Sequence, residues 1–154
     1  MAEHENLRLD HQLCFALYAA TNAITRVYRG KLKEVGMTYP QYLVMLVLWE
    51  EDGVPIKSIA ERLQLDAATI TPLVQRLEEA EMVTKKRDAA DDRIVNVYLS
   101  EKAREIKARV AELQNSVACQ TGLSDKNFEE LRSSLHRLVE TLNQDAEPDK
   151  QPAA

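Results

Sequence analysis

The chain has 154 residues, a length that fits one domain and allows folding to bury about 68–70% of the surface of the unfolded chain. Its 25 acidic and 20 basic side chains give a formal net charge of −5, which argues against a protein that coats nucleic acid indiscriminately but allows binding through a small basic face. No stretch reaches the roughly 18 apolar residues of a membrane span, and no basic region followed by an apolar run opens the chain, so we expect a cytoplasmic protein without membrane contact.

A long first helix is predicted from Asp10, as its N-cap, to about Glu34, with Gly36 closing it. One face carries an apolar stripe of Leu13, Ala16, Leu17, Ala20, Ile24 and Val27. The adjoining face carries Cys14, Thr21, Thr25 and Tyr28. This spacing is that of an amphipathic helix, which needs a packing partner.

The second predicted helix is the expected centre of the core. Thr38 and Gln41 form a capping box, in which the hydroxyl and the amide each satisfy a free backbone donor. The helix then runs through Tyr42–Trp49, which is apolar on every side. Such a helix must be surrounded by protein, either its own chain alone or its own chain together with a second subunit.

Two amphipathic helices follow. The first has an apolar stripe of Ile56, Ile59, Ala60 and Leu63, and the second has one of Ile70, Leu73, Val74 and Leu77. Between them Asp66 is a good N-cap, because its carboxylate can accept from the free N–H groups that open a helix. Two helices joined by so short a turn indicate a helix-turn-helix. Pro72 lies inside the second helix, where we expect a bend rather than a break.

The face of the second helix opposite its apolar stripe suits a DNA groove. It presents small, hydrogen-bonding and basic side chains, namely Ala68, Thr69, Thr71, Gln75 and Arg76. Groups of this kind approach base edges in the major groove closely. We therefore expect these five residues to bind double-stranded operator DNA.

A basic hairpin is predicted next. Its strands are Val83–Arg87 and Arg93–Leu99, and the second alternates with the period of a half-buried strand. Such a wing would place Arg93 in a minor groove and Lys85, Lys86 and Arg87 on phosphates. The alternative is a solvated strand edge, since the stretch from 57 to 93 holds seven basic and eight acidic residues.

Two further helices are predicted after the hairpin, capped by Ser100 and Ser124 and separated near Gly122. Their apolar stripes consist of Ile106, Val110, Leu113 and Val117, and of Phe128, Leu131, Leu135, Leu138, Val139 and Leu142. These stripes either fold back on their own chain or form a homodimer interface, which we favour because helix-turn-helix proteins read paired half-sites. We therefore assign 1–35 and 100–143 to a helical dimerisation region, 36–99 to a winged helix-turn-helix and 144–154 to a disordered tail.

The two cysteines, Cys14 and Cys119, are not expected to form a permanent disulfide in a reducing compartment. Two thiols without a neighbouring histidine pair also make a poor zinc site. The sequence therefore predicts neither a metal nor a cofactor.

Three stretches together carry a resemblance to a known family. They are 9–18, 38–50, and Leu65–Asp66 with Thr69–Leu73. They resemble the organic hydroperoxide resistance regulators (OhrR type) of the MarR family, and the likeness extends over about residues 7–143. The expected fold is mostly α with a small β-hairpin wing, a winged helix-turn-helix.

The resemblance implies a dimeric repressor rather than an enzyme. Cys14 would be oxidised by an organic hydroperoxide acting as inducer, and DNA would then be released. By the same resemblance Tyr28 and Tyr39 support the Cys14 thiolate, and Cys119 of the other subunit forms a disulfide with Cys14.

The sequence departs from the family at several positions. Ala67–Ala68 replaces a common Ser-Gly, which removes a serine contact to DNA, and Ala89 and Asp92 replace the proline and glutamate usual in the hairpin tip. Asp88, which supports the wing, and Arg93 keep the family pattern. We therefore expect a different operator preference and a looser wing.

The chemistry of a sensing thiol places its own demands on the chain. The thiolate is the nucleophile toward peroxide, and the first turns of a helix favour negative charge. Cys14 and Tyr28 are fourteen residues apart on one helix, or about 21 Å, so Tyr28 can support Cys14 only across a dimer interface. The alternative is that both cysteines are small buried hydrophobes and that the tyrosines belong to the core.

Two other functions stay open. One is a winged-helix regulator released by a small aromatic ligand, with structural cysteines. The other is a thiol peroxidase, which is disfavoured because no arginine or threonine closely precedes Cys14 to activate a peroxide.

Overall fold

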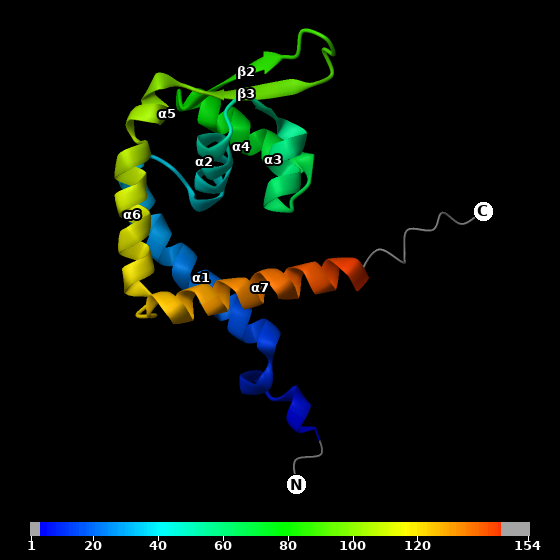
Figure 1. Cartoon of the computed structure of the whole chain (residues 1–154), viewed down its shortest axis with the longest axis vertical. Coiled ribbons are helices and arrows are strands. Elements are labelled where there is room, and N and C mark those ends of the chain that lie inside the picture. The colour runs from blue at the N-terminus through cyan, green and yellow to red at the C-terminus, as the bar shows by residue number, and fades with distance from the viewer. Residues whose placement is uncertain (1–3, 146–154) are drawn as a thin grey trace, which may run out of the picture. The chain divides into compact units, whose positions relative to one another are not determined.

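The computed structural model describes residues 4–145, which are mostly helical with one small sheet (Figure 1). The α-helices are α1 Leu13–Leu32, α2 Tyr39–Glu50, α3 Ile56–Leu63, α4 Ala67–Glu79, α5 Glu101–Glu105, α6 Lys107–Gln120 and α7 Asp125–Asp145. Short 3-10 helices occupy Glu5–Leu7, Leu9–His11 and Lys33–Val35. The strands are β1 Val54–Pro55, β2 Val83–Arg87 and β3 Val95–Leu99. The predicted mostly helical fold with a hairpin wing is confirmed.

The chain divides into two compact units, residues 1–117 and 118–154. The second unit holds α7, where Ser124 is the N-cap as predicted, since its Oγ accepts from the Asn127 backbone N–H at 3.3 Å. The tail predicted for 144–154 falls mostly on 146–154, which lie outside the described residues. None of the helices in the described part of the chain is long and apolar enough to cross a membrane.

The start of α1 differs from the prediction. Asp10 lies in the 3-10 helix Leu9–His11 and does not cap α1, which begins at Leu13 after Gln12, a residue that makes no side-chain cap. The 3-10 turn uses local backbone bonds such as Gln12 N–H to Leu9 carbonyl, so the helix starts two residues later than expected. The other end is closed by Gly36, whose φ of 69° is left-handed, after a short 3-10 turn.

Helix α2 is the centre of the core, as its sequence predicts. Val44, Met45 and Leu48 are fully buried. The predicted capping box is present, because Thr38 Oγ1 accepts from the Gln41 backbone N–H at 3.4 Å and Gln41 Oε1 accepts from the Thr38 N–H at 2.8 Å. The box also explains why the polar Gln41 can be buried at the edge of an apolar core.

Helices α3 and α4 form the predicted helix-turn-helix. The turn passes through Gln64, which is left-handed with φ 55°, to the N-cap Asp66. Ile59, Ile70 and Val74 are fully buried against the core. Helix α4 continues without a break through Pro72.

The sheet contains one strand that the sequence did not reveal. β1 pairs antiparallel with β3, which pairs in turn with β2, in the order β1-β3-β2. Gly53 leads into β1 with φ 74°, and a Cβ added there would lie 2.6 Å from the Tyr98 ring. This position therefore requires glycine both for its backbone and for the close approach of a strand side chain.

The helix predicted after Ser100 is interrupted at Ile106, which separates α5 from α6. Polar contacts tie this joint to the end of α2. Trp49 Nε1 donates to the Ala103 carbonyl at 3.1 Å, and Lys107 Nζ donates to the Trp49 carbonyl at 3.0 Å. Arg104 donates to the Asp52 carboxylate at 2.7 Å. The start of the C-terminal helices is thus fixed to the winged helix-turn-helix.

Candidate nucleic-acid interface and cysteine site

The outer face of α4 is open to solvent. All five α4 side chains predicted to meet DNA are exposed, namely Ala68, Thr69, Thr71, Gln75 and Arg76. The opposite face is held by the buried Ile70, Val74 and Leu77. Burial of one face therefore fixes which groups the helix presents.

The first turn of α4 is held by Asp66. Its Oδ1 accepts from both the Thr69 hydroxyl and the Thr69 backbone N–H at 2.8 Å. These hydrogen bonds lower the pKa of the Asp66 carboxyl, so the cap is charged at neutral pH. The contact orients Thr69 at the point where a helix entering a groove meets the bases first.

The three basic residues of β2 do not share one face. Lys85 Nζ lies 3.1 Å from the Glu78 carboxylate, and the Lys85 backbone N–H donates to the same side chain. Lys86 points to the other face of the strand, where its Nζ lies 5.2 Å from the centre of the Tyr98 ring. The hydrogen bonds that Glu78 accepts from Lys85 lower the pKa of the Glu78 carboxyl, and the bond from the backbone N–H contributes more than the bond from the side chain. Lys85 thus has a fixed acidic partner within its own chain.

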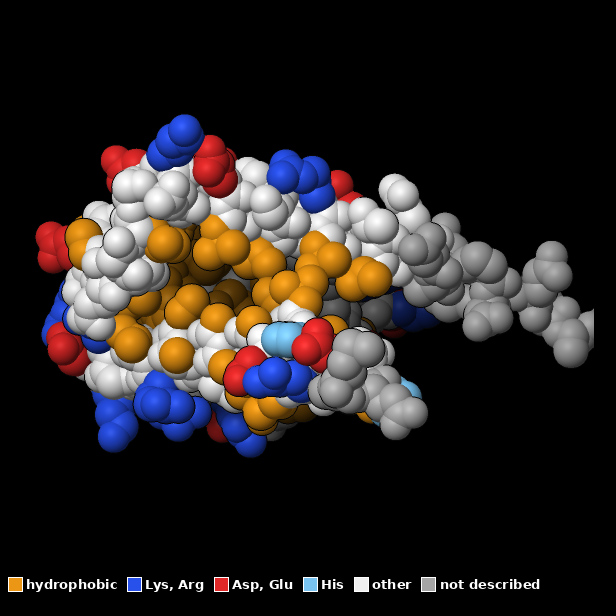
Figure 2. Space-filling model, turned by 90° about the horizontal axis from the view of Figure 1, so that it is seen from below, with side chains coloured by type: hydrophobic (Ala, Val, Ile, Leu, Met, Phe, Trp, Pro, Cys, Tyr) orange, Lys and Arg blue, Asp and Glu red, His pale blue; other side chains and the backbone are white. Residues whose placement is uncertain are grey.

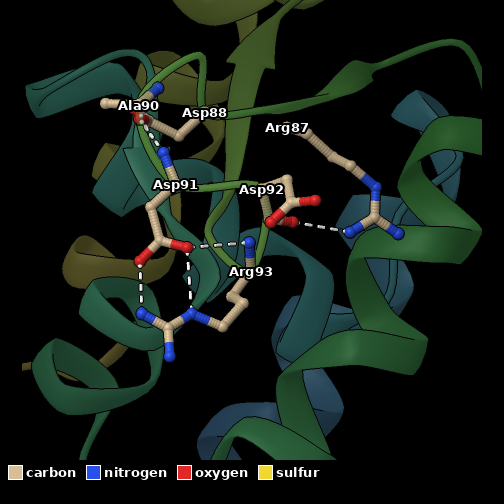
Figure 3. A network of polar contacts seen from close by, with 6 residues as sticks. All are labelled: Arg87, Asp88, Ala90, Asp91, Asp92 and Arg93. Carbon is tan, nitrogen blue, oxygen red and sulfur yellow. Dashed lines mark hydrogen bonds and ion pairs between the residues drawn. The ribbon is translucent and has the colours of Figure 1, made fainter.

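The wing tip is organised around Asp88 (Figure 3). Its Oδ1 accepts from the backbone N–H groups of Ala90 at 2.9 Å and Asp91 at 3.2 Å. Its Oδ2 accepts from the Asn96 amide at 3.3 Å. The backbone bonds lower the pKa of the Asp88 carboxyl. A proline at position 89 is therefore not required to order this turn.

Arg93 extends from the wing tip with its side chain 88% exposed. Its guanidinium donates twice to the Asp91 carboxylate at 3.0 Å, and its backbone N–H donates to the same group at 3.1 Å (Figure 3). These contacts lower the pKa of Asp91, so the pair is charged at neutral pH. Sequence reasoning missed Asp91 as the partner; its position two residues before Arg93 was the available signal.

Arg87, the last residue of β2, turns back toward the tip. Its Nη1 donates to the Asp92 carbonyl at 2.7 Å (Figure 3). This bond links the end of β2 to the far side of the turn, so Arg87 stabilises the wing tip that carries Arg93.

Both cysteines are free and exposed in the described chain. Cys14 is the second residue of α1, within the first turn, where unpaired backbone N–H groups favour negative charge. Neither cysteine is therefore a small buried hydrophobe in this chain. No group of three or more His, Cys, Asp or Glu residues within 4–145 is placed to hold a metal ion.

The two tyrosines predicted to support a thiolate lie together, with ring centres 5.2 Å apart. Tyr42 completes the cluster at 5.3 Å from Tyr28, a member that sequence reasoning counted only as core although it follows Tyr39 by one turn of α2. Burial, and next the neighbouring Tyr28, raises the pKa of Tyr39 and of Tyr42. Their hydroxyls therefore stay protonated, as hydrogen-bond donors, well above neutral pH.

A cavity of about 520 Å³ opens beside this cluster. Its walls include Tyr28, Tyr39, Trp49, Lys107 and Gln114. This volume lies within the roughly 300–1,000 Å³ typical of small-molecule pockets.

Comparison with known proteins decides the family. Residues 26–110 match the family described as transcriptional regulator SarA/Rot. The chain is also 43% identical over 146 residues to the HTH-type transcriptional regulator TtmR of Methylorubrum extorquens, covering 95% of this chain and 75% of that protein. The chain belongs to the MarR-type winged-helix transcriptional regulators.

Two further proteins are similar to this regulator over most of its length. It is 35% identical over 140 residues to the organic hydroperoxide resistance transcriptional regulator of Bacillus subtilis, covering 91% and 95% of the two chains. This confirms the predicted relationship to that branch. Reduced AbfR bound to DNA matches with a TM-score of 0.79 and 33% identity, over 94% of this chain and 98% of that one. A disulfide-formed structure of AbfR matches at 0.64 and 33%, over 92% and 94%.

Proposed function

We propose that this MarR-type regulator is a redox-sensing repressor. A reduced homodimer binds operator DNA, and oxidation of Cys14 by an organic hydroperoxide releases it. The observation that carries the proposal is the exposed Cys14 thiol in the first turn of α1. The N-terminal end of a helix favours a negatively charged group such as a thiolate, and peroxide reaches the sulfur from solvent.

The tyrosine cluster supports this proposal. Cys14 and Tyr28 stand on one helix of Leu13–Leu32, about 21 Å apart at 1.5 Å per residue. Tyr28 and Tyr39 therefore donate to the Cys14 sulfur of the partner subunit rather than to their own. Because the pKa of Tyr39 is raised, its hydroxyl keeps the proton that such a bond to a thiolate requires.

The proposed chemistry balances without a further reactant. The Cys14 thiolate attacks the distal oxygen of the hydroperoxide, the O–O bond breaks, and the alkoxide leaves as an alcohol after taking a proton. The sulfur is oxidised to a sulfenic acid and the peroxide is reduced. Cys119 of the other subunit then attacks the sulfenic sulfur as a thiolate, which forms the disulfide and releases hydroxide, and the hydroxide takes a proton to become water.

The disulfide couples oxidation to DNA release. It requires the two Cα atoms to come within about 7 Å of one another, which constrains α1 of one subunit against the end of α6 of the other. The spacing of the two α4 helices changes with them, and paired half-sites are read only at a fixed spacing. Thr69, Thr71, Gln75 and Arg76 would then leave the major groove and Arg93 the minor groove.

Operator binding under organic hydroperoxide tests the proposal. Cys14→Ser should remain bound where the wild type dissociates, because serine forms no sulfenic acid. Cys119→Ser is the matched control: it should react at Cys14 but give no covalent dimer on a non-reducing gel. Release of the Cys14→Ser protein at the wild-type peroxide concentration would exclude Cys14 as the sensor.

The cavity beside the tyrosine cluster favours a second candidate, a regulator released by a small aromatic ligand. Its tyrosine and tryptophan walls suit stacking with an aromatic ring. Labelling of Cys14 by a sulfenic-acid probe at low peroxide separates the two functions. Unlabelled Cys14, together with release by an aromatic compound, would favour this second candidate.

A further inference from the structure

The end of α4 is joined to the wing by a carboxylate that contacts one residue of β2 twice. Glu78 lies in the last turn of α4. Its Oε1 accepts from the Lys85 backbone N–H at 3.1 Å, and its Oε2 lies 3.1 Å from Lys85 Nζ. Because both oxygens of the side chain contact the same strand residue, the strand is held in orientation as well as in distance.

This contact lies at the free edge of the sheet. β2 is an edge strand, because the strand order is β1-β3-β2. Edge strands have N–H groups without a strand partner, and the Lys85 N–H is satisfied by α4 instead. Val83 at the start of β2 is buried, whereas Lys86 and Arg87 at its end are exposed. Glu78 therefore holds β2 at the point where the strand leaves the core.

A short series of contacts leads from this point to the wing tip. Arg87, two residues beyond Lys85 on β2, donates to the Asp92 carbonyl at 2.7 Å (Figure 3). Arg93 is the next residue in the chain. The position of Arg93 relative to α4 therefore depends on where Glu78 holds Lys85.

The same contact bears on Lys85, which the sequence assigns to a DNA phosphate. A lysine that binds phosphate offers its ammonium to the DNA, whereas Lys85 Nζ lies beside the Glu78 carboxylate. The two side chains are 32% and 38% exposed, and ion pairs in contact with solvent add little to stability through their charges. The main effect of the pair is therefore geometric, because it holds β2 on α4.

We infer that Glu78 and Lys85 are positioning residues, which hold the wing at a fixed angle to α4 so that Arg93 and α4 meet one DNA duplex together. Two contact points on one rigid body lose less freedom on binding than two that move separately. This inference rests on the proposed function in one respect, the binding of operator DNA by α4 and Arg93. It replaces the expected contact between Lys85 and a phosphate.

A double-mutant cycle between Glu78 and Arg93 tests the coupling. The probe is the duplex that the reduced wild-type protein selects from a random library, and its affinity is measured at physiological salt. Glu78→Ala should weaken binding about tenfold, although the loss of a negative charge near DNA would by itself strengthen it. In the Arg93→Ala protein the same change should cost less than about twofold, because no arginine is left to position.

Two further variants separate positioning from charge and from folding. Glu78→Gln keeps an acceptor oxygen for the Lys85 N–H and should bind within about threefold of the wild type. Glu61→Ala removes the same charge from the exposed surface of α3 and should bind at least as tightly as the wild type. Equal losses from Glu78→Ala with and without Arg93 would overturn the positioning role, and so would a gain in affinity.

The salt dependence of binding tests the role of Lys85. The loss of one phosphate contact lowers the slope of log affinity against log salt concentration by about 0.9. The Glu78→Gln/Lys85→Met variant removes one negative and one positive charge, so its net charge is that of the wild type, and its slope should be unchanged. A slope lower by about 0.9 would assign Lys85 to a phosphate and overturn the inference.

Failure of this inference is distinguishable from failure of the proposed function. All of these measurements use reduced protein, so a regulator that did not sense peroxide would give the same results. If Arg93→Ala weakens binding but shows no coupling to Glu78, only the positioning role is overturned. If Arg93→Ala has no effect on affinity, the wing does not reach the groove, and both the inference and that part of the proposed function are overturned.

Discussion

The winged helix-turn-helix and the terminal helices treat their apolar side chains in opposite ways. In the first region Leu48 of α2 and the stripe residue Ile70 of α4 are completely buried by their own chain. In α1 and α7 the corresponding residues face outward: Leu13 is 61% exposed and Leu142 is 59% exposed. Figure 2 shows hydrophobic side chains spread over the face that it presents.

One region of the molecule therefore buries its apolar side chains within its own chain, and the other leaves them exposed. Amphipathic helices draw most of their stability from packing, and exposed apolar faces of this extent mark interaction surfaces. We therefore propose that a second copy of the chain covers α1 and α7. The DNA-reading unit then folds within one chain, and only the spacing of two such units depends on assembly.

The largest expected effect concerns the core of the winged helix-turn-helix. Leu48→Ala removes a side chain with no exposed surface, and such a change in a packed core costs about 2–5 kcal/mol of unfolding free energy. Urea unfolding followed by circular dichroism should show this loss at every protein concentration. Independence from concentration is the decisive point, because this core belongs to a single chain.

In α7 the stability loss should instead depend on protein concentration. Leu131 is 50% exposed in α7, so Leu131→Ser should cost about 1–2 kcal/mol where the dimer forms, a part of the roughly 1.5–3 kcal/mol for burying a leucine fully. In dilute protein the cost should approach zero. His136→Ser, on the same helix, is the control. An effect independent of concentration would mean that α7 packs on its own chain.

A smaller loss is expected at the capping box of α2. Thr38→Ala removes the acceptor of the Gln41 N–H and should lower the unfolding free energy by about 1 kcal/mol. Thr38→Ser keeps the hydroxyl and serves as the control in the same urea titration. If serine and alanine were equally destabilising, the hydroxyl would not be the stabilising group.

The smallest effect concerns the tyrosine cluster and pH. The pKa of Tyr39 is raised above its ordinary value of 10.0, so the folded chain holds this proton more tightly than the unfolded chain does. The stability that this contributes is complete below pH 10 and is lost as the pH rises further. Tyr39→Phe should therefore flatten the fall in stability above pH 10. An identical alkaline slope in both proteins would contradict a half-buried, protonated Tyr39.

Local signals in the sequence predicted much of this molecule. The Asp66 cap, the Thr38–Gln41 box and the apolar α2 depend on residues within one or two turns of each other, so their pattern alone was sufficient. The prediction that Asp10 caps the first helix was wrong for a related reason. An acidic residue is compatible with several local turns, and here a 3-10 helix competed with the start of α1. The Ile106 interruption likewise has no proline or glycine to signal it.

The sequence by itself determined which segments form the main helices, which face of each helix is apolar, and that the hairpin follows the helix-turn-helix. The tertiary structure alone decided that β1 adds to β3, that Lys85 faces Glu78 and that Arg93 is held by Asp91. It also brought Tyr42 into the cluster of Tyr28 and Tyr39. Periodicity records which face of an element is apolar, whereas strand pairing and side-chain partners depend on segments that meet only when the chain folds.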